Sequence, residues 1–290
     1  MSDFETIGFI GVGVMGEPMC RNLAQKGDLP VVANDPNPEP LDRLGAAGVE
    51  ALPSAADVAA RADLVFLSLP SGAEVSAVAE SLLANPRAGQ VVVDTSTTPV
   101  KLTRDLAARF REAGIAFADA PIARTRAAAE AGTLSVMVGA DRALFDRIEP
   151  FIRCYASDIT LCGDVGAGQV VKIMNNMVLF QTVVALSEAL AVGRRAGVDG
   201  ERLFDTLTKG SADSFALRNH GMKALLPGEF PLRAFSTRYA LKDLACALEL
   251  AEDVGLKLQG AELARALLTE TVEQGHGDEY FPAVITTIER

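Results

Sequence analysis

The chain is poor in residues that bind metals or form disulfides. Its 290 residues include only four cysteines and two histidines, and no Cys-x-x-Cys pair is present. Zinc sites and disulfide-rich scaffolds need more such residues at closer spacing. We therefore expect no metal centre, reduced thiols and a cytoplasmic location.

Positive charge and long apolar runs are also scarce. Twenty-seven Lys and Arg stand against 38 Asp and Glu, and the net charge of −11 disfavours nucleic-acid and anionic membrane surfaces. The longest strongly apolar stretch, 172–188, contains Asn175, Asn176 and Gln181. It is shorter than the ~20 residues of a membrane span, and the acidic N-terminal sequence does not fit a secretory signal. We expect a soluble protein with neither a nucleic-acid nor a membrane partner.

Motifs of several enzyme classes are missing as well. The sequence contains no Gly-x-Ser-x-Gly elbow, no Gly-Lys-Ser/Thr phosphate loop and no His-Glu-x-x-His helix. Hydrolase and NTPase functions therefore have no support from motifs.

What the chain does have is an alternation of short apolar runs and Ala/Leu-rich amphipathic segments. Such alternation indicates βαβ units and a mainly parallel sheet. The predicted strands are 7–10, 31–34, 64–69, 91–94, 115–119, 134–138 and 159–161. Beyond residue 168 nearly everything is helical in pattern. We predict an α/β fold: a Rossmann-type doubly wound domain over 1–163, a long interdomain helix over 164–195, and an all-α domain over 196–290.

A glycine-rich turn follows the first predicted strand and opens a helix. Gly11, Gly13 and Gly16 enclose Val14 and Met15 in the pattern Gly-x-Gly-x-x-Gly. Glycines at these places allow a tight turn and close approach of the backbone to a pyrophosphate, which the helix N-terminus then binds. The turn predicts a dinucleotide site, although a merely structural turn has the same pattern.

Two further strand ends are candidates for the same site. Asn34 and Asp35 end the second strand a little over 20 residues beyond Gly11, where the adenosine ribose is expected. The charge of Asp35 would repel a 2′-phosphate, which favours NAD over NADP; the alternative is a strand-ending turn at Asp35-Pro36. Leu69 and Pro70 end another predicted strand at the carboxyl edge, where ligands bind. The alternative is that the proline only marks a loop.

Hydride chemistry needs a group that moves a proton on or off the substrate oxygen. His220 and His276 stand in polar, Gly-flanked sequence, and we expect both at the surface or in loops. Lys172 enters the apolar helix, and Asn176 follows on the same face one turn later. A lysine there is costly unless it is paired or functional, or reaches solvent from the helix end.

With these residues in view, the sequence resembles the β-hydroxyacid dehydrogenase family, which includes 3-hydroxyisobutyrate dehydrogenase. The likeness covers the whole chain in ordered blocks. These are Phe9 to Gly16 with Met19 and Asn22-Leu23; Asp94-Thr95-Ser96-Thr97; Asp119-Ala120-Pro121 with Gly132-Thr133-Leu134; Gly166-x-Gly168-x-x-x-Lys172-x-x-Asn175-Asn176; and Lys242-Asp243.

The resemblance implies roles for individual residues. Lys172 would be the acid/base and Asn176 would orient the substrate. Thr97 and Lys242 would contact the cofactor, with Lys242 closing over cofactor and substrate. The acid group of the substrate would be held by Ser96 and by the segment after Pro121, namely Ile122, Ala123, Arg124 and Thr125. The family's site lies between its domains, and its members usually form homodimers or homotetramers.

One block departs from the family pattern. After Ile122 the family usually continues Ser-Gly-Gly, whereas this chain has Ala123-Arg124-Thr125. Sulfolactaldehyde reductases of the same family are similar here, with Gly-Arg-Thr. Arg124 offers a forked donor to a carboxylate or sulfonate, unless it pairs with an acid such as Glu130 or turns to solvent.

The expected function is therefore NAD-dependent interconversion of a short β-hydroxy acid, similar to 3-hydroxyisobutyrate, and its semialdehyde. One alternative is a sulfolactaldehyde reductase. Another is a non-catalytic nicotinamide-nucleotide sensor, which would need neither Lys172 with Asn176 nor the Lys242-Asp243 pair. An imine reductase would share the architecture but usually has another residue at the lysine position.

Overall fold

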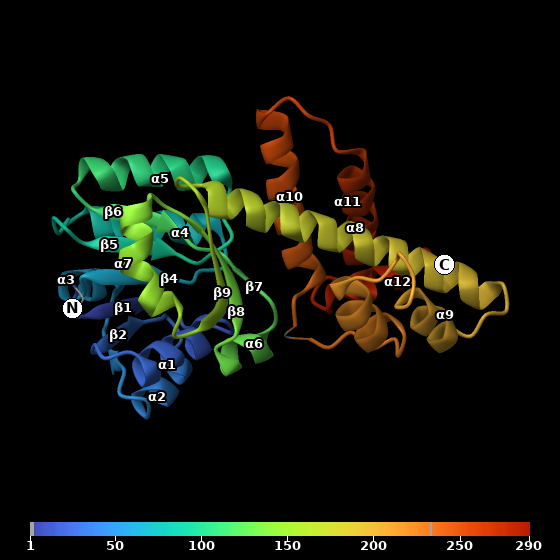
Figure 1. Ribbon diagram of the computed structural model, residues 1–290, viewed down its shortest axis with the longest axis horizontal. Helices are drawn as coiled ribbons and strands as arrows, with labels where there is room; N and C mark the ends of the chain where they lie inside the picture. The colour runs from blue at the N-terminus through green and yellow to red at the C-terminus, as the bar shows by residue number, and fades with distance from the viewer. Residues whose placement is uncertain (1–2, 233) are drawn as a thin grey trace. The chain divides into compact units, whose positions relative to one another are not determined.

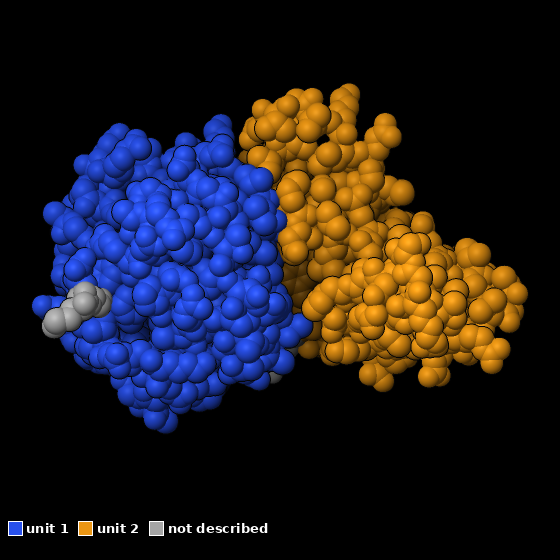
Figure 2. All heavy atoms as spheres, in the orientation of Figure 1, with its two compact units in different colours: residues 1–172 blue, residues 173–290 orange. Residues whose placement is uncertain are grey.

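The computed structural model describes residues 3–232 and 234–290, which form two compact units. The units divide at Lys172 and Ile173, inside helix α8 (Ala167–Arg195) (Figure 2). The predicted organisation had instead made residues 164–195 a separate connector. The difference has a local cause: the first turn of α8 is hydrogen-bonded to the sheet of unit 1, as described below, so it belongs to that unit.

Unit 1 is built on a nine-stranded sheet (Figure 1). Its strand order is β3-β2-β1-β4-β5-β6-β8-β7, with β9 paired to β8; β1 to β6 run parallel, and β8 is antiparallel to β6 and β7. The order around β1 is that of the Rossmann fold, as predicted. The strands are β1 Ile7–Ile10, β2 Val31–Asn34, β3 Glu50–Ala51, β4 Leu64–Leu67, β5 Val91–Asp94, β6 Ala116–Asp119, β7 Ile122–Ala123, β8 Leu134–Gly139 and β9 Ala156–Gly163.

Helices cover both faces of this sheet, and each face has its own apolar core. In β4, Leu64 and Phe66 belong to one core while Val65 and Leu67 belong to the other. A strand buried on both faces needs apolar residues throughout, which is why the runs were visible in the sequence. The helices of this unit are α1 Gly16–Lys26, α2 Pro38–Gly45, α3 Ala55–Arg61, α4 Gly72–Leu83, α5 Val100–Glu112, α6 Arg126–Ala131 and α7 Arg142–Ile152.

Unit 2 contains the rest of α8 and further helices, with two isolated β-bridges that join Leu232 to Glu279 and Ser236 to Tyr280. Side-chain caps start α9 and α10: Asp199 accepts a hydrogen bond from Arg202 N, and Ser236 accepts one from Tyr239 N. The elements are α9 Gly200–Leu207, η1 Leu217–Leu225, α10 Thr237–Asp253, α11 Gln259–Thr271, η2 Val272–His276, η3 Phe281–Ala283 and α12 Val284–Ile288.

Helix α8 extends on both sides of the strongly apolar stretch 172–188. It has 29 residues, and by length and composition alone it could cross a membrane. That criterion is weak, because the central helix of a soluble protein also meets it. The absence of a membrane partner stays a prediction.

The position of His220 differs from the surface or loop position that the sequence predicted. It lies buried in η1, with 7% of its surface exposed, and its Nδ1 is hydrogen-bonded to the hydroxyl of Tyr280. Its ring also packs beside Phe281 and Phe215. Burial lowers the pKa of His220 to about 4. The polar flanking sequence had suggested a surface position, but the ring fills an aromatic cluster.

Candidate active site

The glycine-rich turn connects β1 to α1 in a geometry that excludes side chains at two of its three glycines. A Cβ on Gly11 would lie 2.3 Å from Ser68 O, and one on Gly16 would lie 2.0 Å from Gly11 O. A Cβ on Gly13 would meet nothing within 4 Å, so glycine there leaves open space beside the backbone. This is the space that a pyrophosphate needs at a dinucleotide turn.

Helix α1 presents an N-terminus to the same space. Its cap residue Met15 makes no side-chain capping hydrogen bond, and Val14 beside it is exposed. The first N–H groups of a helix have no intrahelical acceptor and carry a partial positive charge. The turn and the helix start therefore fit the diphosphate of a dinucleotide.

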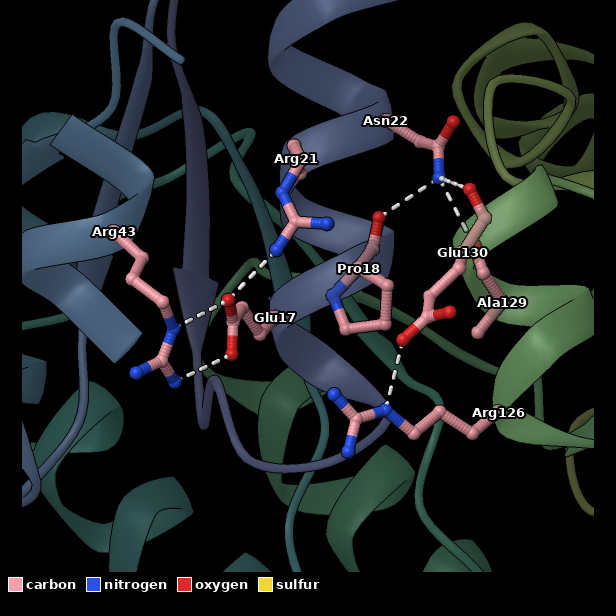
Figure 3. Close-up of polar contacts among 8 residues, drawn as sticks. All are labelled: Glu17, Pro18, Arg21, Asn22, Arg43, Arg126, Ala129 and Glu130. Carbon is pink, nitrogen blue, oxygen red and sulfur yellow. Dashed lines mark hydrogen bonds and ion pairs between the residues drawn. The ribbon is translucent and has the colours of Figure 1, made fainter. Parts of the chain in front are cut away.

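Contacts on two sides hold α1 in place (Figure 3). Glu17, almost buried, accepts hydrogen bonds from Arg43 Nε and Nη2 at 2.9 and 2.8 Å and from Arg21 at 2.7 Å. Arg43 lies in α2, and its guanidinium holds the pKa of the Glu17 carboxyl below its usual range. Asn22 donates to Pro18 O and to Ala129 O of α6. The phosphate-binding turn thus precedes a helix that is fixed to α2 and α6.

Asp35 lies against the glycine-rich turn. Its Oδ2 accepts from Val12 N at 2.7 Å, and its Oδ1 accepts from Asn37 N at 2.8 Å. Its negative charge is therefore fixed at the end of β2, where the ribose was predicted. Asn34, predicted for the same role, donates from its Nδ2 to Leu52 O, and its part in ribose binding stays a prediction.

The loop after β5 is tied to the loop after β4. Ser96, 5% exposed, accepts from Leu69 N through its hydroxyl at 2.9 Å, and its own N–H donates to Asp94. Thr97 follows half-buried, and Pro70 is exposed. The structure thus brings Leu69 and Ser96 together at the carboxyl edge of the sheet, where ligands bind in such folds.

The start of α8 is bonded to the end of β6. Asp119 is fully buried and accepts from Gly166 N at 2.6 Å and Gln169 N at 2.7 Å. A Cβ on Gly168 would lie 2.8 Å from Asp119 Oδ2, so glycine permits this approach. Burial raises the pKa of Asp119 to about 6. The carboxylate fixes the helix start three residues before Lys172, which is itself 8% exposed.

The segment 122–125, predicted to bind the acid group of the substrate, has defined partners within unit 1. The guanidinium of Arg124 donates to Thr133 O, just before β8, and to Ser157 Oγ of β9, and it pairs with Asp158 Oδ2 of β9 at 2.8 Å. Thr125 caps α6 with its hydroxyl. Ile122 and Ala123 form β7 and are half-buried. Substrate binding by this segment stays a prediction, and Arg124 could serve it only by leaving Asp158.

Within unit 2, Asn176 has a fixed amide. Its Nδ2 donates to Asp243 Oδ2 at 2.6 Å, and its Oδ1 accepts from Asn175 Nδ2 at 3.1 Å. Asp243 is 2% exposed and pairs with Lys242 through Oδ1 at 3.1 Å; Lys242 also lies over the ring of Tyr239. The orientation of the Asn176 amide thus depends on Asp243.

Three buried polar residues, Asp119, Gln169 and Asp243, were not among the predicted site residues. Asp119 and Asp243 occur in sequence blocks noted above, but nothing in their local pattern shows which groups they bind. Gln169 gave no signal beyond a polar residue in the first turn of an apolar helix. Among the described residues, no group of His, Cys, Asp and Glu could hold a metal ion.

Comparisons with known proteins give a consistent result. Residues 6–163 match the family model of the NAD-binding domain of 6-phosphogluconate dehydrogenase. Residues 166–288 match the model described as the NAD-binding of NADP-dependent 3-hydroxyisobutyrate dehydrogenase. The chain belongs to the β-hydroxyacid dehydrogenase family. It is an NAD(P)-dependent oxidoreductase of the 3-hydroxyisobutyrate dehydrogenase type, with an NAD-binding domain in unit 1.

Relatives of known name match along nearly the full length. The 2-(hydroxymethyl)glutarate dehydrogenase of Eubacterium barkeri is 35% identical, with 98% of this chain and 95% of the relative covered. The 2-hydroxy-3-oxopropionate reductase of Escherichia coli is 32% identical, with 98% and 97% covered. The structure of Mycobacterium tuberculosis 3-hydroxyisobutyrate dehydrogenase with L-serine has a TM-score of 0.91 at 31% identity and covers 100% of both chains.

Proposed function

We propose that this family member oxidises a short β-hydroxy acid, similar to 3-hydroxyisobutyrate, to its semialdehyde with NAD, and catalyses the reverse reduction. The observation that carries the proposal is the start of α8. There, buried hydrogen bonds join the helix bearing Lys172 to the loop bearing Ser96. These bonds hold the first turn of α8 against the loop at the carboxyl edge of the sheet, which supports a shared site for Lys172 and Ser96.

Each residue has a defined part in the proposed reaction. Ser96 and the backbone of 122–125 bind the acid group of the substrate. Lys172, as a neutral amine, accepts the hydroxyl proton while the C–O bond becomes a carbonyl, and Asn176 on the next turn of α8 orients the substrate oxygen. Bound NAD⁺ supplies the hydride acceptor. In the reverse direction the Lys172 ammonium returns the proton to the carbonyl oxygen.

The preference for NAD rests on Asp35. Its carboxylate is fixed by Val12 N at the end of β2. A 2′-phosphate bound there would meet an uncompensated negative charge, whereas ribose hydroxyls could donate to it.

The arrangement of Arg124 argues against the sulfonate alternative. That alternative depends on a guanidinium directed at the substrate anion, and Arg124 is instead paired with Asp158. We also propose, from the family, a cytoplasmic homodimer or homotetramer that acts on a small anionic substrate.

A substrate panel tests the proposed function. The purified protein is incubated with NAD or NADP and with 3-hydroxyisobutyrate, serine, 3-hydroxypropionate, glycerate, 2-(hydroxymethyl)glutarate or dihydroxypropanesulfonate, and nicotinamide reduction is followed. We expect NAD-dependent turnover of a β-hydroxycarboxylate. Turnover of the sulfonate alone would favour the alternative, and NAD binding without turnover of any compound would support the nucleotide sensor.

A further inference from the structure

Gln169 is a buried polar residue to which the proposed reaction gives no part. It is fully buried in the first turn of α8. A buried amide costs free energy unless its polar atoms are hydrogen-bonded. The groups that satisfy it belong to the loop that carries Ser96.

The side chain of Gln169 binds this loop with both ends of its amide. Nε2 donates to Ser96 O at 2.8 Å, and Oε1 accepts from Thr98 N at 3.2 Å. The backbone N–H of the same residue donates to Asp119 Oδ2 at 2.7 Å. One residue therefore joins the end of β6, the loop after β5 and the helix that bears Lys172.

The loop end of this link is itself well ordered. Asp94 accepts from Ser96 N, and its other oxygen accepts from Thr98 Oγ1 at 3.4 Å. The Ser96 hydroxyl holds Leu69 N. A shift of the Gln169 amide is therefore passed to Ser96 as a shift of the whole loop backbone.

We propose that Gln169 is a positioning residue that sets the placement of Ser96 relative to Lys172. This inference rests on the proposed function, because it acts through the groups that bind the acid end of the substrate and move its proton. Gln169 touches neither substrate nor cofactor in this role. Its effect is on the geometry of proton transfer, which is sensitive to displacements of about 1 Å.

The test compares Gln169→Met with a matched variant, Gln90→Met. Gln90 is also buried, at 3% exposed, and its Nε2 donates to Ala59 O and Ala62 O at 2.8 and 2.7 Å. It precedes β5 at the end opposite Ser96. Both variants lose a buried amide, so both lower Tm, but only Q169M disturbs the link. We expect kcat to fall about 10- to 100-fold in Q169M and to stay near wild type in Q90M.

A double-mutant cycle separates positioning from a general loss of structure. If Gln169 acts through Lys172, then Q169M costs little further turnover in a chain that already carries Lys172→Ala. Additive losses in the double variant would overturn the proposal. Equal kcat losses in Q169M and Q90M would overturn it too.

Gln169→Glu gives a second variant in case Q169M does not fold. A glutamate keeps an acceptor for Thr98 N, but only its protonated form can donate to Ser96 O. We expect the ratio of Q169E to wild-type kcat/KM to rise as the pH is lowered from 8 to 6. A ratio that does not change with pH would contradict the proposed donor role.

Hydrogen exchange tests the link made by Gln169 without any activity assay, so it does not depend on the proposed function. We expect Q169M, but not Q90M, to lose amide protection at Thr98 and in 170–172. If the wild type oxidises no hydroxy acid but this loss is seen, the proposed reaction fails while the link stands. Unchanged protection would overturn the link whatever the substrate.

Discussion

The Arg124 guanidinium lies 2.8 Å from the Asp158 carboxylate. The backbone of the same residue has a φ of 87°, in the left-handed region. Arg124 is the only non-glycine residue with positive φ among residues 3–232 and 234–290. L-residues pay a steric cost in this left-handed region, which glycine does not. This explains why glycines suit this segment in the family pattern. It also indicates that the contacts to Thr133, Ser157 and Asp158 hold the arginine here.

Replacing Arg124 by Ala distinguishes a structural from a substrate-binding role. Because its donors are engaged by Asp158, Ser157 and Thr133, we expect KM for a β-hydroxycarboxylate to change less than about threefold, well below the loss of a charged hydrogen bond. Arg126→Ala, which removes an exposed arginine paired with Glu130, is the control. A selective rise in KM of tenfold or more would show that Arg124 leaves Asp158 to bind the substrate anion.

Replacing Lys172 by Ala should remove the proton-transfer group. We expect kcat to fall about 10²- to 10⁴-fold, the usual contribution of a positioned acid/base, while the Kd for NAD is little changed. Steady-state kinetics and NAD titration measure the two quantities. Lys101→Ala, at an exposed position of α5, is the matched control. Near-normal turnover in K172A would remove this residue from the mechanism.

Replacing Asp35 by Asn should weaken discrimination between the two cofactors. The asparagine keeps an acceptor for Val12 N but loses the charge that repels a 2′-phosphate. We expect the ratio of kcat/KM with NAD to that with NADP to fall about tenfold, equivalent to about 1.4 kcal/mol. Asp42→Asn makes the same charge change at an exposed position of α2. An unchanged ratio in D35N would show that the preference has another source.

Asp119 should make stability fall as the pH rises. Burial raises its pKa from 3.8 to about 6 in the folded protein, so between these values the folded state binds more protons than the unfolded state. Its contribution is therefore most favourable below pH 3.8 and is lost as the pH rises through 6. The free energy of unfolding, relative to Asp119→Asn, should drop by about 1 to 3 kcal/mol over this range. Urea titrations at several pH values measure it; a flat difference would contradict the buried carboxylate.

His220 should have the opposite effect of pH. Its pKa is lowered from 6.5 to about 4, so on acidification the unfolded state takes up the proton first. Its contribution to stability is complete above pH 6.5 and is lost as the pH falls towards 4, by about 1 to 3 kcal/mol. Since the chain has only two histidines, an NMR titration with His220→Gln to assign the signals can follow it directly. A His220 signal that titrates near 6.5 would contradict burial.

The sheet could be predicted because its central strands are buried on both faces and therefore appear as continuous apolar runs. Two strands of two residues each were missed: Glu50–Ala51, which is exposed, and Ile122–Ala123, which is half-buried. A strand of two residues is too short to show the run or alternation of apolar residues from which strands are predicted. The glycine-rich turn was predictable because a backbone constraint at fixed spacing is local.

Partners across the fold were not predictable in the same way. Glu130 was the acid named for Arg124 in the alternative to substrate binding, but Glu130 pairs with Arg126 on α6, while Arg124 pairs with Asp158. Asp158 is adjacent only because β9 pairs with β8 in a particular register. The bonds of Asp119 and Gln169 likewise join segments about 50 and 70 residues apart, and only the sheet order brings these together.

Helix α8 continues across the boundary between the two units, and this limits where the chain can be truncated. A fragment that stops at Lys172 would end inside a helix, and the last four carbonyl groups of a helix have no intrahelical donor. The final turn of such a fragment would fray, and the residue it would release from order is Lys172 itself. A truncation meant to isolate the nucleotide-binding half should therefore retain several further turns of α8.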